Sequence, residues 1–237
     1  MTFHIIIPAR YGSTRLPGKP LLLLHGKPLL QWVIERAQMA HPASITVATD
    51  DTRIADVAAA CGVPAVLTST AHESGTDRLA EAAHLIGLKD NDIVVNLQGD
   101  EPFMPAIAIQ QVADTLACRT EPMATLCTPL TSSETLINPN GVKVVFNQHQ
   151  QALYFSRSPI PFGAHTHYRH IGIYAYRVAF LKQYVAWGPC ALEMQEKLEQ
   201  LRALWHNIPI VVPIAQEAPV GDINTPEDLK AAHAWAL

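Results

Sequence analysis

A segment near the start of the chain gathers three cations in a loop that also contains small residues. After the apolar run at residues 3–7, Pro8 begins a stretch with two glycines and with Arg10, Arg15 and Lys19. Small residues let a backbone approach a ligand closely, and the N–H groups of such a loop can face phosphate oxygens. Three cations within ten residues repel one another unless an anion joins them. We therefore expect this loop to bind a triphosphate.

The loop matches neither of the two best-known phosphate-binding patterns. A Walker loop has four residues between its glycines and a Ser or Thr after its Lys. Here five residues separate Gly12 from Gly18, and Pro20 follows Lys19, so ligands for a metal must come from elsewhere. The glycine fingerprint of dinucleotide-binding proteins is absent too. The alternative, a solvated surface loop, is disfavoured because the loop directly follows the first predicted strand, where open α/β sheets bind ligands.

Three further segments are expected at the same edge of the sheet. They are SGTDR at residues 74–78, QGDEP at 98–102 and the region at 220–224. Asp100 follows a glycine at the end of a predicted strand, where a carboxylate is well placed to bind a hard cation such as Mg²⁺. A triphosphate needs that cation because the charge on its oxygens must be neutralised as the bond breaks. The alternative is that Asp100 caps the next helix or forms a turn.

The elements that must position these residues alternate regularly in the first half of the chain. Strands are predicted at 3–7, 45–48, 65–67 and 92–97, and helices at 28–39, 51–61, 76–86 and 106–117. In the second half, strands at 123–129, 142–146, 152–156 and 170–177 precede a helix at 192–204, a strand at 209–214 and a helix start at 224–229. This order predicts one α/β domain over 1–237, with an open, mixed, mostly parallel sheet flanked by helices and a β-rich dimerisation arm.

Composition restricts the class of protein. The chain has 237 residues, 49% hydrophobic and 16% charged, so it is predicted to be globular. A net charge of −4 argues against a protein that binds nucleic acid through an overall positive charge. No signal peptide or apolar run of about 20 residues is evident, which predicts a cytoplasmic protein without membrane insertion. Four widely spaced cysteines predict free thiols, and a metal site at His165, His167 and His170 is a minor alternative.

The chain resembles the 3-deoxy-manno-octulosonate cytidylyltransferase family, the CMP-Kdo synthetases. The matching stretches, in chain order, are IIPARYGSTRLPGKPL, VATDD, SGTDRLAE, VVNLQGDEP, NPNGVKVVF, ALYFSRSPIPF, RHIGIYAYR, LEQLRALW and NTPEDL. The first and third are shared more widely by nucleotidyltransferases for sugars, whereas YFSRSPIPF, HIGIYAYR and LEQLR point to Kdo. The resemblance implies a nucleotide-diphospho-sugar transferase fold, a homodimer, and a Mg²⁺-dependent reaction of CTP with Kdo that gives CMP-Kdo and pyrophosphate for lipopolysaccharide synthesis.

The resemblance also implies roles for individual residues, with residues 1–120 forming a nucleotide-binding half and 121–237 a sugar-binding and dimerisation half. Lys19, Arg10 and Asp100 would be catalytic, and Asp100 would bind magnesium. The nucleotide would be bound by Pro8, Ala9, Arg10, Gly12, Ser13, Arg15, Lys19, Ser74, Gly75 and Asp77. Arg157 would bind the sugar carboxylate, and Gln98, His170, Tyr174, Glu199 and Gln200 would bind its hydroxyl groups.

One position departs from the family pattern. The family usually has Asp, a second magnesium ligand, where this chain has Asn224. Asn offers a carbonyl oxygen without charge, and Asp222 is the nearby carboxylate that could replace the missing ligand. The sequence leaves open which of the two binds the metal.

Three other functions stay open from the sequence. The first is transfer of a nucleotide to sialic acid, 8-amino-Kdo or a sugar phosphate. The second is a glycosyltransferase that consumes a nucleotide sugar, although Asp100 lacks the second Asp of the usual Asp-x-Asp metal motif. The third is a regulator that binds the nucleotide without turnover.

Overall fold

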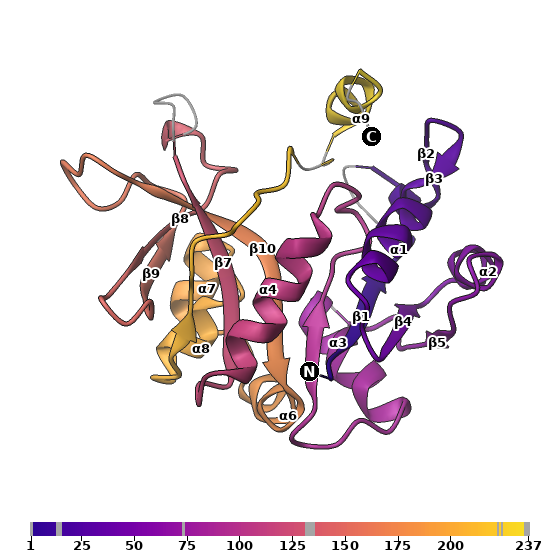
Figure 1. Cartoon of the computed structure of the whole chain (residues 1–237), viewed down its shortest axis with the longest axis horizontal. Coiled ribbons are helices and arrows are strands. Elements are labelled where there is room, and N and C mark those ends of the chain that lie inside the picture. The colour runs from indigo at the N-terminus through magenta and orange to yellow at the C-terminus, as the bar shows by residue number, and fades with distance from the viewer. Residues whose placement is uncertain are drawn as a thin grey trace.

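A mixed β-sheet forms the centre of the molecule (Figure 1). The computed structural model describes residues 2–12, 16–72, 74–130, 136–221, 223 and 225–234. Within them the main path of the sheet has the order β11-β7-β10-β6-β1-β4-β5, and β8 and β9 extend it beside β10. The strands are β1 (His4–Ala9), β4 (Ser44–Thr49), β5 (Ala65–Leu67), β6 (Ile93–Asn96), β7 (Met123–Pro129), β8 (Lys143–Phe146), β9 (Ala152–Ser156), β10 (Tyr168–Arg177) and β11 (Ile210–Val211).

The order of the strands reverses beside β1. The chain runs from β1 to its parallel neighbour β4 and on to β5, then returns to β6 on the opposite side of β1, again in parallel. Strand β10 is antiparallel to β6 and to β7, so the expected mixed sheet is confirmed. In open α/β sheets, ligands bind at the carboxyl ends of the strands where the order reverses. This fold therefore opens a crevice between the segments that follow β1 and β6.

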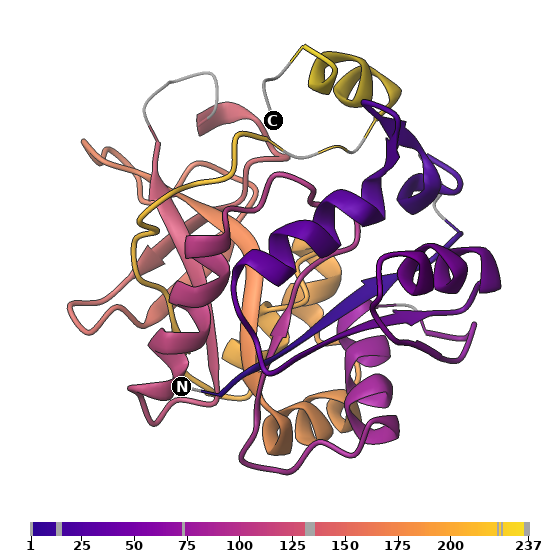
Figure 2. The same cartoon turned by 45° about the vertical axis from the view of Figure 1, so that its right-hand side comes forward.

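Helices cover both faces of the sheet. On one face are α1 (Leu29–Met39), α2 (Thr52–Ala60) and α4 (Ala106–Ala117). On the other are α3 (Gly75–Leu85), α6 (Val178–Trp187), α7 (Ala191–Glu196) and α8 (Leu201–Trp205). Figure 2 shows α1 crossing in front of the sheet. In the described ranges no helix is long and apolar enough to cross a bilayer.

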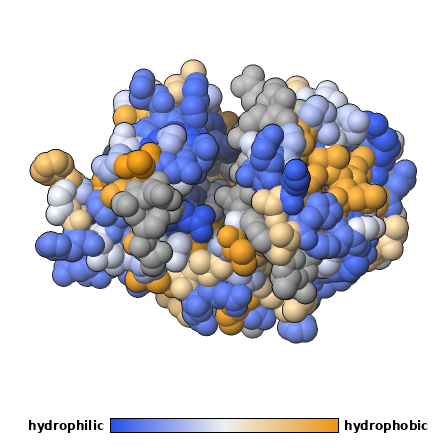
Figure 3. Space-filling model, turned by 90° about the horizontal axis from the view of Figure 1, so that it is seen from above, coloured by the Kyte–Doolittle hydropathy of each residue, from blue (hydrophilic) through white to orange (hydrophobic). Residues whose placement is uncertain are grey.

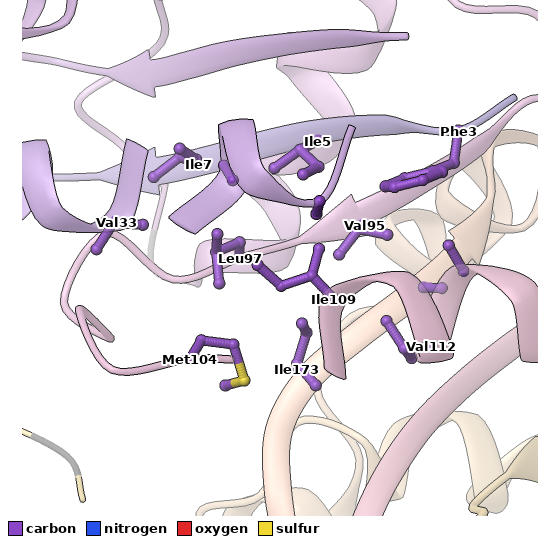
Figure 4. Close-up of a cluster of buried hydrophobic side chains, with 14 of the residues drawn as sticks. Phe3, Ile5, Ile7, Val33, Val95, Leu97, Met104, Ile109, Val112 and Ile173 are labelled. Atoms are coloured by element: carbon purple, nitrogen blue, oxygen red, sulfur yellow. The ribbon is translucent and has the colours of Figure 1, made fainter. Parts of the chain in front are cut away.

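Two hydrophobic cores follow from the alternation of side chains along each strand. Ile5 and Ile7 of β1 join Val95 and Ile109 in the first core, which lies under α1 and α4 (Figure 4). Ile6, between them, belongs to the second core on the opposite face. Because both faces of β1 are buried, its sequence is a continuous apolar run. Both cores draw residues from both halves of the chain.

A third, smaller cluster brings the last helix toward the start of the chain. Leu16, Phe103 and Ile223 are buried together with Ala232 of α9 (Pro226–Ala232). Also in this region are a 3-10 turn at Lys19–Leu21 and a hairpin of β2 (Leu23–Leu24) and β3 (Lys27–Pro28). The segments after β1 and β6 and the segment before α9 thus meet at one end of the sheet, at the top of Figure 1.

One predicted helix is wrong in its extent. The single helix predicted at 192–204 is two short helices, α7 and α8, because Lys197 has a left-handed backbone with φ of 56°. In that single helix Met194, Leu198, Leu201 and Leu204 would form one apolar stripe. In the structure Leu198 and Leu201 are buried, whereas Met194 is 56% exposed. These residues lie on two helices and on the turn between them, so they form no single helical face. The preceding helix α6 was not predicted.

Candidate functional site

The loop after β1 folds back on itself and directs its lysine inward. The Gly18 N–H donates to the carbonyl oxygen of Tyr11 at 3.0 Å, and Gly18 has φ of 66°, which favours glycine. Lys19 follows at the start of the 3-10 turn and is only 5% exposed. Arg10, directly after β1, is exposed. The predicted nucleotide residues Ser13 and Arg15 lie outside the described residues.

Lys19 forms an ion pair with Asp100 from the loop after β6. Lys19 Nζ donates to Asp100 Oδ2 at 2.7 Å, with the two side chains 7% and 40% exposed. Residues 81 positions apart meet because β1 and β6 are neighbouring parallel strands and both loops leave their carboxyl ends. The structure therefore places these two predicted catalytic residues in one site. Figure 3, seen from above, shows a hollow at this end of the molecule.

Close contact between the two loops depends on Gly99. Its N–H donates to the Pro8 carbonyl at 3.2 Å. A Cβ added at Gly99 would lie 2.9 Å from the Cβ of Ala9 and 3.0 Å from the Pro8 carbonyl oxygen. The loop that carries Asp100 is thereby held directly against the end of β1.

The predicted nucleotide turn at 74–77 forms the start of α3. Ser74 is the N-cap residue, and its hydroxyl oxygen accepts from the Asp77 N–H at 3.0 Å. The helix therefore begins one residue earlier than predicted, at Gly75. A Cβ added at Gly75 would lie 3.3 Å from Gln98 Oε1, so this turn contacts one of the predicted sugar-binding residues.

The start of α3 also carries a buried arginine that sequence reasoning missed. Arg78 is 2% exposed and donates to Asp50 Oδ2 at 2.7 Å and to Thr68 Oγ1 at 2.5 Å. These partners follow β4 and β5, so Arg78 ties α3 to the ends of two strands. Arg78 lies within the SGTDRLAE stretch, but a sequence gives no indication that one arginine of such a stretch is buried.

Two of the predicted sugar-binding residues are neighbours on β10. The rings of His170 and Tyr174 are 5.3 Å apart, and His170 Nε2 lies 2.9 Å from Thr125 Oγ1. That hydroxyl also lies 2.7 Å from the carbonyl oxygen of Ile173, which can only accept. Thr125 therefore donates its proton to a carbonyl and accepts from His170 Nε2, which leaves Nδ1 of the imidazole as an acceptor. Burial lowers the pKa of His170 to about 3, so the ring is neutral near pH 7.

Glu199 and Gln200 occupy the break between α7 and α8. Glu199 Oε2 accepts from Thr76 Oγ1 at 2.8 Å, and Gln200 is 5% exposed. Burial raises the pKa of the Glu199 carboxyl, the negative charges of Asp77 and Glu193 add to this effect, and the hydrogen bond from Thr76 opposes it. The Thr76 contact joins residues 123 positions apart and was not predicted.

Arg157 has structural contacts that the sequence did not predict. Its Nε donates to the carbonyl of Glu196 at 2.7 Å, and its two terminal nitrogens donate to the carbonyls of Pro139 and Lys197 at 2.9 and 3.2 Å. These three bonds use three of the five guanidinium N–H groups. The predicted contact with a sugar carboxylate, through the remaining two, stays a prediction.

The structure does not place the second metal ligand, because Asp222 and Asn224 lie outside the described residues. Ile223, between them, is fully buried in the cluster that also contains Leu16 and Phe103. Among the residues that are described, no group of three His, Cys, Asp or Glu side chains could hold a metal ion. His167 Nδ1 instead lies 2.7 Å from the carbonyl oxygen of Ile160.

Comparisons with known proteins show the family to which the chain belongs. The model of the cytidylyltransferase family matches residues 4–210. The 3-deoxy-manno-octulosonate cytidylyltransferase of Vibrio vulnificus is 51% identical over 241 residues, which cover 97% of this chain and 96% of the relative. The protein of the same name from Hahella chejuensis is 51% identical over 246 residues, covering 98% and 96%.

Solved structures give the same result. A CMP:2-keto-3-deoxy-manno-octonic acid synthetase complexed with CTP has a TM-score of 0.91 and 43% identity, covering 99% of this chain and 98% of the other. A cytidylyltransferase from Leptospira borgpetersenii has a TM-score of 0.65 at 18% identity, covering 99% and 86%, and shares the fold alone. The recognition made from the sequence is confirmed, and the chain belongs to the family of 3-deoxy-manno-octulosonate cytidylyltransferases.

Proposed function

We propose that the protein transfers CMP from CTP to Kdo and releases pyrophosphate, in the step that activates this sugar for lipopolysaccharide synthesis. The observation that carries the proposal is the ion pair of Lys19 with Asp100, at the point where the strand order reverses. A buried lysine beside a half-exposed carboxylate suits a ligand with both phosphate oxygens and a bound cation. The family supports the choice of nucleotide and sugar.

The cationic loop and the start of α3 would hold the nucleotide. Pro8, Ala9 and the backbone after β1 lie beside Gly99, and residues 74–77 would lie around the base and ribose. Lys19 and Arg10 would contact the phosphates and stabilise the pyrophosphate as it leaves. The anomeric hydroxyl of the sugar would attack the α-phosphorus in line with the leaving group. The reaction would be accelerated by positioning of the two substrates and by electrostatic stabilisation of the transition state, without a covalent intermediate.

Asp100 suits a magnesium ion that arrives with the nucleotide. Mg²⁺ is usually held by one or two protein carboxylates together with phosphate oxygens and water. One half-exposed carboxylate at a strand end fits that donor set, and Asp222 or Asn224 would add a second oxygen. When bound, the ion would lower the charge on the α-phosphate. Lys19 would then exchange its contact with Asp100 for one with the phosphates.

The second half of the chain would bind the sugar. Gln98, His170, Tyr174, Glu199 and Gln200 supply amide, imidazole, phenol and carboxylate groups that match a ligand with many hydroxyl groups. Arg157 would bind the sugar carboxylate. Residues 1–120 would thus bind the nucleotide and residues 121–237 the sugar. Gln98 is the exception, because it lies in the first half and would bind the sugar.

We also propose that the protein works as a cytoplasmic homodimer. Phe162 and Leu153, in the β-rich region after β8, are more than half exposed, and a dimer interface over this region would bury them. Sedimentation of the purified protein would test this proposal, which predicts a mass of two chains.

The test of the proposed function is pyrophosphate release with CTP, Mg²⁺ and Kdo, against the same mixture without the sugar. We expect release only in the complete mixture, with CMP-Kdo formed in equal amount. UTP, GTP and ATP should replace CTP poorly, and sialic acid, 8-amino-Kdo and sugar phosphates should replace Kdo poorly. Better turnover with another acceptor would reassign the substrate. CTP binding without turnover would indicate a regulator, and consumption of a nucleotide sugar would indicate a glycosyltransferase.

A further inference from the structure

Strand β10 has a bulge between two of the predicted sugar-binding residues. As far as Ile171, which lies opposite Leu126, its residues pair with β7 in a regular antiparallel register. The next pair joins Tyr174 to Thr125, the neighbour of Leu126, so β10 has two extra residues at this point. A bulge bends its strand and redirects the side chains, and bulges are common beside functional sites.

The bulge brings His170 and Tyr174 together. In a regular strand each residue advances about 3.3 Å, so residues four positions apart lie about 13 Å from each other. The ring centres of His170 and Tyr174 are instead 5.3 Å apart. The two rings can therefore reach the same part of a small ligand.

A single buried hydroxyl group holds the bulge. Thr125 is fully buried, and its Oγ1 lies 3.0 Å from the carbonyl oxygen of Ile171 and 2.7 Å from that of Ile173. A buried carbonyl costs free energy unless it accepts a hydrogen bond. The Thr125 hydroxyl supplies this bond at the point where the bulge interrupts the pairing with β7.

The other side of the bulge is packed against the loop that carries Asp100. A Cβ added at Gly172, between Ile171 and Ile173, would lie 3.0 Å from Oε1 of Glu101. The backbone of the bulge is thus enclosed between the Thr125 hydroxyl and the Glu101 carboxyl. This packing favours a single shape for the bulge.

The same hydroxyl group determines which nitrogen of His170 carries the proton. The two carbonyl neighbours can only accept, so the Thr125 hydroxyl donates toward them and accepts from His170 Nε2 at 2.9 Å. The neutral ring therefore keeps a lone pair on Nδ1. Every buried side-chain nitrogen or oxygen in the described ranges has a hydrogen-bond partner, and Nδ1 has none among these residues, so it is open to solvent.

We propose that Thr125 is a positioning residue for the acid sugar, because it holds the bulge that brings His170 to Tyr174 and keeps Nδ1 of His170 as the acceptor of a hydroxyl proton of the ligand. This inference rests on the proposed function and deepens it. It gives the imidazole a definite polarity, in which the ring accepts a hydrogen bond from the sugar instead of donating one. Thr125 itself does not contact the sugar.

Nitrogen-15 NMR of the protein labelled at histidine tests the polarity of the ring directly, because protonated and unprotonated imidazole nitrogens give well-separated signals. His170→Gln identifies the signals of His170. At about pH 7, the wild type and Thr125→Ser should carry the proton of His170 on Nε2 alone. Thr125→Val has the same shape without the hydroxyl group, so part of its His170 should be protonated on Nδ1.

Steady-state pyrophosphate release tests the effect on the sugar. Thr125→Val should raise KM for Kdo on the order of tenfold, as expected when a buried hydrogen bond is lost, while KM for CTP changes less than about twofold. Thr125→Ser should restore the wild-type KM for Kdo. Thr128→Val is the matched control, because Thr128 lies three residues further along β7 and so faces the other side of the sheet. It should change neither KM nor the spectrum of His170.

The outcomes separate this inference from the proposed function. A wild-type His170 that carries its proton on Nδ1 would overturn the inference alone, and this measurement does not depend on the folding of Thr125→Val. An active wild type whose Thr125→Val variant keeps the wild-type KM for Kdo, or loses CTP affinity equally, would also overturn it. A wild type that releases no pyrophosphate with Kdo would overturn the proposed function, and the role in sugar binding with it.

Discussion

Individual residues determine how closely the two loops of the site approach. Lys19 and Asp100 were predicted to meet because each follows a buried strand, and the structure brings them to 2.7 Å. The contact requires Gly99, which leaves no room for a side chain beside Ala9 and the Pro8 carbonyl. A sequence indicates a turn at such a glycine, but not which backbone it touches.

Gly99→Ala should disturb both stability and activity. The added methyl group would lie 2.9 Å from the Cβ of Ala9, so the loop with Asp100 must move away from β1. We expect a loss of about 1–3 kcal/mol in the free energy of unfolding, as for other overpacked sites, measured by urea denaturation. Gly12→Ala is the control for stability, because a Cβ at Gly12 meets no atom within 4 Å. Equal stability of the two variants would show that the loops can separate without cost.

Residues whose types occur in many structural roles could not be recognised from the sequence as making contacts near the site. Thr76 and Arg78 form no local pattern, and their side-chain hydrogen bonds join elements far apart in the chain. Lys19, Asp100 and the turn at 74–77 were recognised because glycines and charges cluster at predicted strand ends or helix starts. Chemistry that is concentrated in one segment could be predicted, whereas a network built from single residues of several segments could not.

Among the elements, the turn between α7 and α8 determines where Glu199 lies. The predicted single helix would have placed Glu199 and Gln200 on a continuous helical face. The structure instead joins the two short helices through a buried ion pair, in which Arg202 donates to both oxygens of Glu193 at 2.8 and 2.6 Å. Helical periodicity alone could not reveal the break, because the pair and the burial of Leu198 are tertiary contacts.

Breaking this ion pair should destabilise the protein strongly. Arg202→Met leaves the Glu193 carboxylate buried without its partner, so we expect a loss of about 3–5 kcal/mol in the free energy of unfolding. Lys182→Met is the control, because Lys182 and Asp90 form an ion pair at 2.6 Å whose side chains are 58% and 65% exposed. That variant should lose less than about 1 kcal/mol. Similar urea midpoints for the two variants would contradict the structural role of the buried pair.

Across the whole molecule, the reversal of strand order beside β1 explains why distant segments form one site. Alternating strands and helices predicted the sheet and the location of the site, because both depend on periodicity and on general rules for α/β folds. The cluster of Leu16, Phe103 and Ile223 could not be predicted, since it depends on how α9 returns across the sheet.

The stability of the whole molecule should depend on His170 at acid pH. The pKa of His170 is about 3 in the folded protein, against an ordinary value of 6.5. The unfolded chain therefore binds this proton first, and stability falls as the pH drops from about 6.5 toward 3. His170→Gln should flatten the plot of unfolding free energy against pH in that window. Parallel curves for wild type and His170→Gln would refute the buried neutral state.

The central claim is that Lys19 and Asp100 together bind a metal-bound CTP. The rate of pyrophosphate release by Asp100→Ala tests this claim most directly. With CTP, Kdo and Mg²⁺ at saturating concentrations, kcat should fall on the order of 10²–10³-fold, as when an electrostatic group of a phosphoryl- or acyl-transfer site is removed. Lys19→Ala should lose a similar factor. Turnover of Asp100→Ala close to that of the wild type would contradict the account.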